Sequence, residues 1–169
     1  MEQRLLEGLV FLVVDGTTGP GRTMAVRLCA HGARVAVVGV VLPGRPDDVT
    51  AAAALTCQEM TRPGRVALPY QLDPADGDAV GRLLAEVWED LGPVSAALVV
   101  VPRDTESPGP PAVIRTLSAR IAESLPDGCR HLELDPGRGG RDRHALSAQD
   151  TWAQRVLKLL VNGPEPDSR

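Results

Sequence analysis

The chain has 169 residues, a formal net charge of −4, and an apolar content of 43% that coexists with only 2% aromatic residues. This length suits one domain, and the negative charge provides no overall field for nucleic acid or an anionic membrane. The apolar runs are far shorter than the ~18 residues of a membrane span. We therefore expect a cytoplasmic protein with neither nucleic acid nor membrane as a partner.

The three cysteines, Cys29, Cys57 and Cys129, are widely spaced and form no CxxC motif. An odd number of such cysteines predicts reduced thiols. No His, Cys and Asp spacing resembles a metal site. No secretory signal sequence is recognised at the start of the chain, which also favours the cytoplasm.

The first predicted elements are a strand, a glycine-rich turn and a helix. The apolar run Leu9–Val14 does not alternate with polar residues, so it predicts a central strand buried on both faces. The turn Asp15–Gly21 follows, and then an amphipathic helix, Arg22–His31, that ends at Gly32. Pro20 fits the mouth of this helix, because a first helical turn accepts proline.

A second strand is predicted at Arg34–Leu42, where the centre of the segment is again apolar. The next helix is predicted to run through Met60. Its N-terminal cap is expected to be Asp47 or Thr50, since short polar side chains satisfy the first free N–H groups of a helix.

The third strand, Val66–Leu72, is predicted to lie at an edge of the sheet. Pro69 interrupts it, and proline cannot donate to a strand ladder. A helix capped by Asp76 or Asp78 follows, and its apolar residues form one stripe. The stripe consists of Val80, Leu83, Leu84, Val87, Trp88 and Leu91.

The rest of the chain predicts two strands and two helices. The strands are Val94–Val101 and Arg130–Leu134, and the helices are Pro111–Leu125 and Leu146–Val161. The polar segment Asn162–Arg169 is expected to be a disordered tail.

Five strands separated by helices predict an α/β fold: a Rossmann-like, doubly wound parallel sheet with helices on both faces. Right-handed crossovers give the strand order 3-2-1-4-5, which places the strand with the proline at an edge. We expect a single domain over residues 1–161, followed by the tail at 162–169.

Three motifs resemble the short-chain dehydrogenase/reductase (SDR) family. GTTGPGR at Gly16–Arg22 resembles the cofactor-binding turn TGxxxGxG. QLDPAD at Gln71–Asp76 resembles the segment whose Asp contacts adenine. LGPVSAALVVV at Leu91–Val101 resembles the strand that leads into the NNAG motif. Family members usually run well beyond this length. The resemblance therefore implies a shortened SDR domain that lacks the last strands and the substrate lid.

The resemblance implies a dinucleotide site whose binding residues are Gly16, Gly19, Gly21 and Asp73. Such a site uses glycines for close approach and free N–H groups at a helix N-terminus. Departures from the family pattern lead us to expect no cofactor. A weak or remodelled NAD(P) site, with Arg45 near a phosphate, is the alternative.

Four departures carry this expectation. Asp15 stands at the first glycine of the family turn, where a carboxylate would repel a pyrophosphate. Pro20 removes one N–H from the helix N-terminus. Gly39 and Val40 stand where the family has an Asp for the NAD ribose or an Arg for the NADP phosphate. Pro74 removes the N–H that would accompany the adenine contact.

The catalytic pattern of the family is absent as well. NNAG aligns with Val99–Pro102, and Tyr-x-x-x-Lys aligns with Leu146 and Asp150. The chain's one tyrosine is Tyr70, and its one lysine is Lys158. The family's hydride transfer needs a tyrosine as proton donor and a lysine that lowers its pKa. We therefore predict no redox catalysis by the family mechanism.

Four residues remain as candidates for catalysis: Asp15, Thr18, Asp135 and His144. The carboxylates follow the first and fifth strands, at the edge where open α/β sheets form clefts. A histidine with one or two carboxylates suits acid–base chemistry near neutral pH. The alternative is structural, with Asp15 and Thr18 ordering the turn and His144 solvated in a loop.

Two surfaces are candidates for partners. The helices Pro111–Leu125 and Leu146–Val161 correspond to those through which SDR proteins commonly dimerise, so we expect a homodimer or a heterodimer. Arg138, Arg141 and Arg143 form a positive cluster that suits a phosphopantetheine carrier or another acidic carrier protein. A solvated loop is the alternative for this cluster.

Two functional hypotheses follow. The first is a non-redox SDR-like protein of a small-molecule pathway, such as secondary metabolism, that performs cyclisation, dehydration or isomerisation on a small-molecule substrate. The second is a catalytically inactive subunit that pairs with a complete reductase or a carrier protein. An NAD(P)-dependent oxidoreductase with an unusual site is a third alternative.

Overall fold

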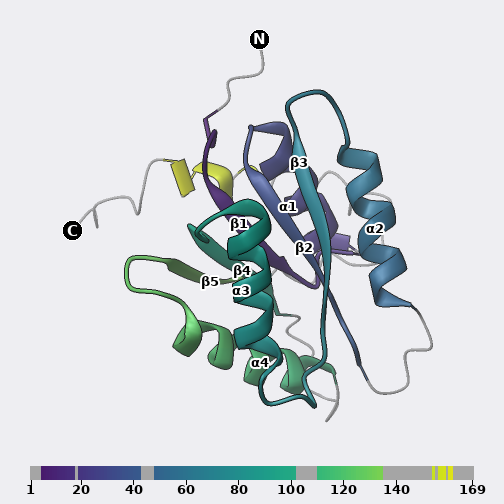
Figure 1. Ribbon diagram of the computed structural model, residues 1–169, viewed down its shortest axis with the longest axis vertical. Coiled ribbons are helices and arrows are strands. Elements are labelled where there is room, and N and C mark those ends of the chain that lie inside the picture. Colours follow the sequence, from purple (N-terminus) through teal and green to yellow (C-terminus); the bar gives the residue numbers. More distant parts are fainter. Residues whose placement is uncertain are drawn as a thin grey trace.

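The computed structural model describes residues 5–17, 19–42, 48–101 and 110–134, together with 154, 156–158 and 160–161. Its centre is a parallel five-stranded sheet with the order β3-β2-β1-β4-β5 (Figure 1). The predicted Rossmann-like sheet and its strand order are confirmed. The strands are β1 (Val10–Val14), β2 (Arg34–Val40), β3 (Val66–Leu72), β4 (Ala96–Val100) and β5 (Arg130–Leu134).

Helices cover both faces of the sheet (Figure 1). One face packs against α3 and α4, and the other packs against α1, α2 and the helical residues 156–157. This arrangement is the predicted doubly wound fold. The labelled helices are α1 (Gly19–Ala30), α2 (Val49–Met60), α3 (Ala79–Leu91) and α4 (Pro110–Ser124).

β1 is the centre of the sheet and contributes to both hydrophobic cores. It pairs with β2 on one side and β4 on the other. Val10, Leu12 and Val14 join the core beneath α3 and α4, whereas Phe11 and Val13 join the core beneath α1 and α2. Because both faces are buried, the strand is apolar at every position.

β3 lies at an edge of the sheet, as Pro69 predicted. The register places Pro69 opposite Val37 of β2, and no described strand pairs with the other side of β3. Ala67 and Leu68 are only half-buried, unlike the side chains of β1. A proline is tolerated here because the outer edge has no ladder to complete.

The cap of α2 differs from the prediction. Asp48 is the N-cap residue, in place of the predicted Asp47 or Thr50. Its Oδ1 accepts the backbone N–H groups of Thr50 at 3.0 Å and Ala51 at 3.1 Å. The residue type was predicted correctly, but its position depends on where the chain enters the helix.

Two further details are corrected. α1 begins at Gly19 and not at Arg22, because Pro20 is accepted within its first turn. Trp88 was predicted in the apolar stripe of α3, yet its side chain is 55% exposed. Residues at 80, 83, 87 and 91 already form the buried face of this helix, and position 88 lies at the margin of that face.

The cysteines are free thiols, as predicted, and Cys29 and Cys57 are buried. Burial raises the pKa of the Cys57 thiol to about 11. A buried thiol with a raised pKa is a poor nucleophile. These two residues therefore act as small apolar side chains between the sheet, α1 and α2.

No helix within the described residues is both long enough and apolar enough to cross a bilayer. The predicted tail at 162–169 lies outside the described residues. The prediction of a single domain over residues 1–161 stays a prediction.

We expect Gly39→Ala to lower the free energy of unfolding by about 1–3 kcal/mol, because a crowded core must shift to accept a methyl group. A Cβ at Gly39 would lie 2.6 Å from the carbonyl oxygen of Val49 and 2.9 Å from its Cβ. The matched control is Gly81→Ala in α3, where a Cβ meets nothing within 4 Å. That change should stabilise the helix by roughly 0.5–1 kcal/mol. Urea denaturation of both variants measures the contrast, and equal effects would contradict it.

Candidate functional site

β1 ends in the turn predicted from its acidic, glycine-rich sequence. The backbone N–H groups of Asp15 and Gly16 donate to the carbonyl oxygen of Val38, at 3.0 and 3.3 Å. Asp15 has a φ of +60°, the only positive value among the non-glycine residues that the structure describes. Aspartate is one of the few residue types that visit this region. The turn places Asp15 at the edge of the sheet where open α/β folds bind ligands.

Glycines bring the start of α1 close to this turn. A Cβ at Gly21 would collide with the carbonyl oxygen of Asp15, and Gly19 has a φ of +50°. A Cβ at Gly16 would lie 3.1 Å from Val13. These glycines therefore allow the backbone of the turn to pack closely on itself, and their contact with a dinucleotide stays a prediction.

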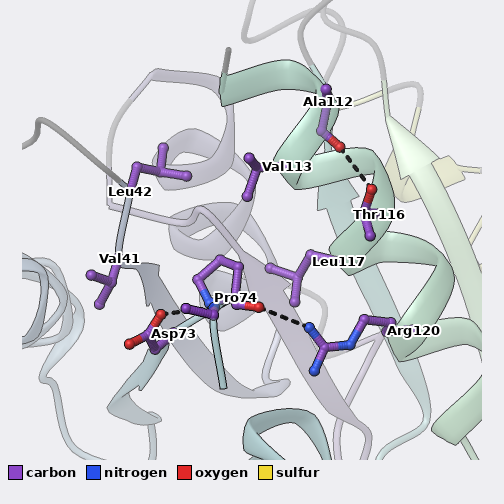
Figure 2. Close-up of a pocket in the computed structure, with 10 residues that line it drawn as sticks. Val41, Leu42, Asp73, Pro74, Ala112, Val113, Thr116, Leu117 and Arg120 are labelled. Carbon is purple, nitrogen blue, oxygen red and sulfur yellow. Dashed lines mark hydrogen bonds between the residues drawn. The ribbon is translucent and has the colours of Figure 1, made fainter. Parts of the chain in front are cut away.

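A pocket of about 550 Å³ lies between the end of β2, the loop after β3 and α4 (Figure 2). This volume falls in the range of small-molecule sites, roughly 300–1,000 Å³. Its walls are mostly aliphatic. They are formed by Val41 and Leu42 after β2, by Asp73, Pro74 and Ala75 after β3, and by Ala112, Val113, Thr116, Leu117 and Arg120 of α4.

Arg120 ties α4 to the loop after β3. Its guanidinium donates to three backbone carbonyl oxygens: Pro74 at 3.0 Å, Asp76 at 2.9 Å and Gly77 at 2.8 Å. Figure 2 shows the first of these bonds crossing the pocket wall. Because charged donors make stronger hydrogen bonds than neutral ones, this residue holds the loop in place.

Asp73 lies at the rim of the pocket, and its side chain is exposed. Its Oδ1 accepts the N–H of Ala75 at 2.9 Å, and its carbonyl oxygen accepts the N–H of Asp76 at 3.2 Å. Pro74 has no N–H. The predicted Asp73 is in place, but the N–H groups that follow it are missing or already bonded.

The end of β2 presents apolar side chains where the family pattern has a ribose or phosphate contact. Val40 is 1% exposed and Leu42 is 3% exposed. Gly39 packs against the start of α2, and Asp48 caps that helix. Together with Pro20 in the first turn of α1, these features mean that the described residues do not fit the dinucleotide pattern. The candidate Arg45 lies outside the described residues.

The single tyrosine has a structural partner. The phenol of Tyr70 donates to Oδ2 of Asp90 in α3, at 2.8 Å. Burial raises the pKa of Tyr70 above its ordinary range, and the hydrogen bond and the charge of Asp90 act in the same direction. Lys158 is exposed. A proton donor of the family type needs a lowered pKa, and Tyr70 has the opposite.

Several predicted site residues cannot be placed. Thr18, Asp135, His144 and the arginine cluster at 138–143 lie outside the described residues. The glycine turn and Asp73 are present at the C-terminal side of the sheet, as predicted. Across the part of the chain that the structure describes, no three His, Cys, Asp or Glu side chains are grouped to hold a metal ion.

The pocket residues of α4 were not predicted as site residues. Leu117 lies in the helix Pro111–Leu125, which the sequence assigned to a partner surface. The apolar side chains Ile114, Leu117 and Ile121 of this helix are at most 1% exposed and pack on their own sheet. The opposite side of α4 carries exposed residues such as Arg115 and Ala119. Dimerisation through this helix stays a prediction.

Neither a model of a known protein family nor any curated protein matches the sequence. Solved structures do resemble the fold. A dehydrogenase/reductase from Sinorhizobium meliloti matches with a TM-score of 0.64 at 17% identity, over 94% of this chain and 90% of that one. A blue fluorescent protein from a metagenomic library, in complex with NADPH, matches with a TM-score of 0.58 at 23% identity, over 93% of this chain and 67% of that one.

A short-chain dehydrogenase/reductase variant from Serratia marcescens gives a TM-score of 0.56 at 20% identity, over 91% of this chain. The chain has the SDR fold. It spans 66% of the Serratia marcescens protein. The resemblance found in the sequence motifs is confirmed at the level of the fold, and at these identities the likeness says nothing further about activity.

For this SDR-like chain, we expect stability to fall as the pH rises above about 10, the ordinary pKa of tyrosine. The neutral phenol of Tyr70 is favoured in the folded state, so its contribution is complete below that pH and is lost as the phenol ionises. Tyr70→Phe should lack this component. The raised pKa of Cys57 gives a decline of the same sign in both proteins. Urea denaturation at several pH values, with phenolate absorbance, measures the difference. Ionisation near pH 10 without loss of structure would contradict the expectation.

We expect Arg120→Met to destabilise the chain by about 2 kcal/mol, because three carbonyl oxygens lose a charged donor. Amide hydrogen exchange should accelerate at Ala75 and Asp76, whose N–H groups are bonded within the loop. Arg115→Met, on the exposed side of the same helix, is the control. Unchanged exchange in the Arg120 variant would show that the loop holds its shape without this residue.

Proposed function

We propose that the chain is a non-redox SDR-like protein that acts on a small molecule in a biosynthetic pathway. The reaction is acid–base chemistry such as cyclisation, dehydration or isomerisation, and Asp15 is its acid–base group. The observation that carries the proposal is the placement of Tyr70, since the only tyrosine is hydrogen-bonded to Asp90 and has a raised pKa.

Hydride transfer to a carbonyl needs a group that protonates the oxygen as negative charge develops on it. In the SDR pattern this group is a tyrosine assisted by lysine. Here Val99 and Val100 are buried, apolar residues at the end of β4, where the pattern has NNAG. Neither side chain carries a proton or a hydrogen-bonding group.

We also propose that the chain does not bind a dinucleotide. The donors and anchors expected at Pro20, at the end of β2 and after Asp73 are missing from the described residues. The metagenomic blue fluorescent protein was solved with NADPH. Its likeness supports a common fold, whereas Pro20, Val40 and Pro74 support a different ligand for this chain.

Asp15 is the strongest acid–base candidate among the described residues. Its side chain is half-buried and follows directly after the central strand. A carboxylate can take a proton from a substrate that lies within hydrogen-bond reach of it. The bond from its N–H to the carbonyl oxygen of Val38 holds the backbone of the turn that carries this carboxylate.

The test has two parts. In the first, NADH and NADPH are supplied with a panel of ketones and aldehydes, and absorbance at 340 nm is followed. We expect no consumption above the background rate. Consumption above the background rate would refute the non-redox assignment.

In the second part, the substrate is identified by incubating the chain with extracts of its source and following mass changes that leave the molecular formula unchanged or remove water. Asp15→Asn should then lower turnover by about 10²–10⁴-fold, the usual contribution of a general base. Asp48→Asn is the control, because asparagine caps a helix nearly as well as aspartate. Equal turnover in the two variants would remove Asp15 from the mechanism.

A further inference from the structure

The pocket between β2, β3 and α4 has mostly aliphatic walls that favour an apolar ligand. Val41 and Leu42 form the side next to β2, and Val113 and Leu117 form the side next to α4 (Figure 2). Leu42 and Leu117 are almost fully buried, so these walls are set by the core. A ligand that enters removes apolar surface from water, which is the main favourable term in such a site.

The charged residues of the pocket do not provide a phosphate site. Arg120 is the only cationic residue among the described lining residues, and it already donates to three backbone carbonyl oxygens. Asp73 adds a negative charge at the rim. A phosphate placed here would meet a carboxylate without gaining a free guanidinium, so a nucleotide is disfavoured.

The loop after β3 also lacks free donors for the edge of a purine. Pro74 has no N–H, and the N–H of Ala75 donates to Oδ1 of Asp73. A purine ring nitrogen that loses its water here would remain without a partner, and such a loss costs free energy. A ring edge made of carbon carries no such cost.

Asp73 is suited to a ligand that donates a hydrogen bond. A carboxylate has about four lone-pair positions, and the N–H of Ala75 occupies one of them on Oδ1. A hydroxyl group on the ligand that reaches the rim can therefore donate to this carboxylate. Hydrogen bonds to a charged acceptor are stronger than those between neutral groups.

We propose that the pocket binds a neutral molecule whose buried part is hydrocarbon and which carries a hydroxyl group, and that it does not bind a nucleoside or nucleotide, whose ring nitrogens find no donor here. The hydrocarbon part lies between the β2 side and the α4 side, and the hydroxyl donates to Asp73. This inference rests on the proposed function, because it names the chemical class of the molecule on which the non-redox protein acts.

Calorimetric titration of the whole chain with 1-naphthol, adenosine and AMP tests the ligand class. We expect 1-naphthol to bind at least about ten-fold more tightly than adenosine, since the purine leaves polar atoms unpaired. AMP should bind no more tightly than adenosine. Absence of 1-naphthol binding, tighter binding of adenosine, or a gain in affinity from the phosphate would overturn the proposal.

Two variants of α4 locate the binding. Ala112→Trp places a large side chain in the pocket wall and should weaken 1-naphthol binding by about ten-fold or more, because the ring system loses its space. Ala119→Trp is the control, since Ala119 is exposed on the same helix and does not line the pocket. Equal affinity of the two variants would place the ligand elsewhere and overturn the assignment.

The role of Asp73 is tested with a pair of ligands. Asp73→Ala should lower the affinity for 1-naphthol several-fold and leave that for 1-methoxynaphthalene unchanged, because the ether cannot donate a hydrogen bond. An equal loss for both ligands would contradict the hydroxyl contact. These binding measurements use no nicotinamide, so their failure leaves the non-redox proposal standing, whereas consumption of NADPH would refute that proposal independently.

Discussion

The burial of β1 on both faces is the constraint on which the rest of the structure depends. A parallel sheet needs crossover connections, and its helices then cover both of its sides. The central strand must consequently consist of side chains that pack in either direction. The step at its end must turn the chain sharply, because the first helix returns across one of these faces. Positive φ at Asp15 and the lack of a side chain at Gly21 make that turn fit.

The glycines of the first turn serve this architecture directly. A side chain at Gly21 would collide with the backbone of Asp15, so packing alone requires glycine there. The ends of β2 and β4 carry valines, Val40, Val99 and Val100, which are buried and belong to the core. The pocket lies between α4 and the loop after β3, and the bonds of Arg120 link these two walls.

The sequence was sufficient for the sheet, its strand order and the edge position of β3. Apolar runs, glycine turns and Pro69 are local signals, and each acts within a few residues. The pocket was harder to predict from the sequence, because Arg120 bonds to residues more than forty positions earlier in the chain. No local pattern encodes such a contact. The exposure of Trp88 was predicted wrongly for a related reason. A helical stripe shows which residues share a face of the helix, but it does not show how much of that face the neighbouring sheet covers.

Pro69 has a consequence for the behaviour of the protein in concentrated solution. An exposed sheet edge is a template on which another molecule can add a strand, and growth of this kind leads to aggregation. Here an incoming strand would meet a proline in the middle of β3, where the run of backbone donors is interrupted. The residue that marks the sheet's boundary in the sequence therefore also protects the fold from open-ended assembly.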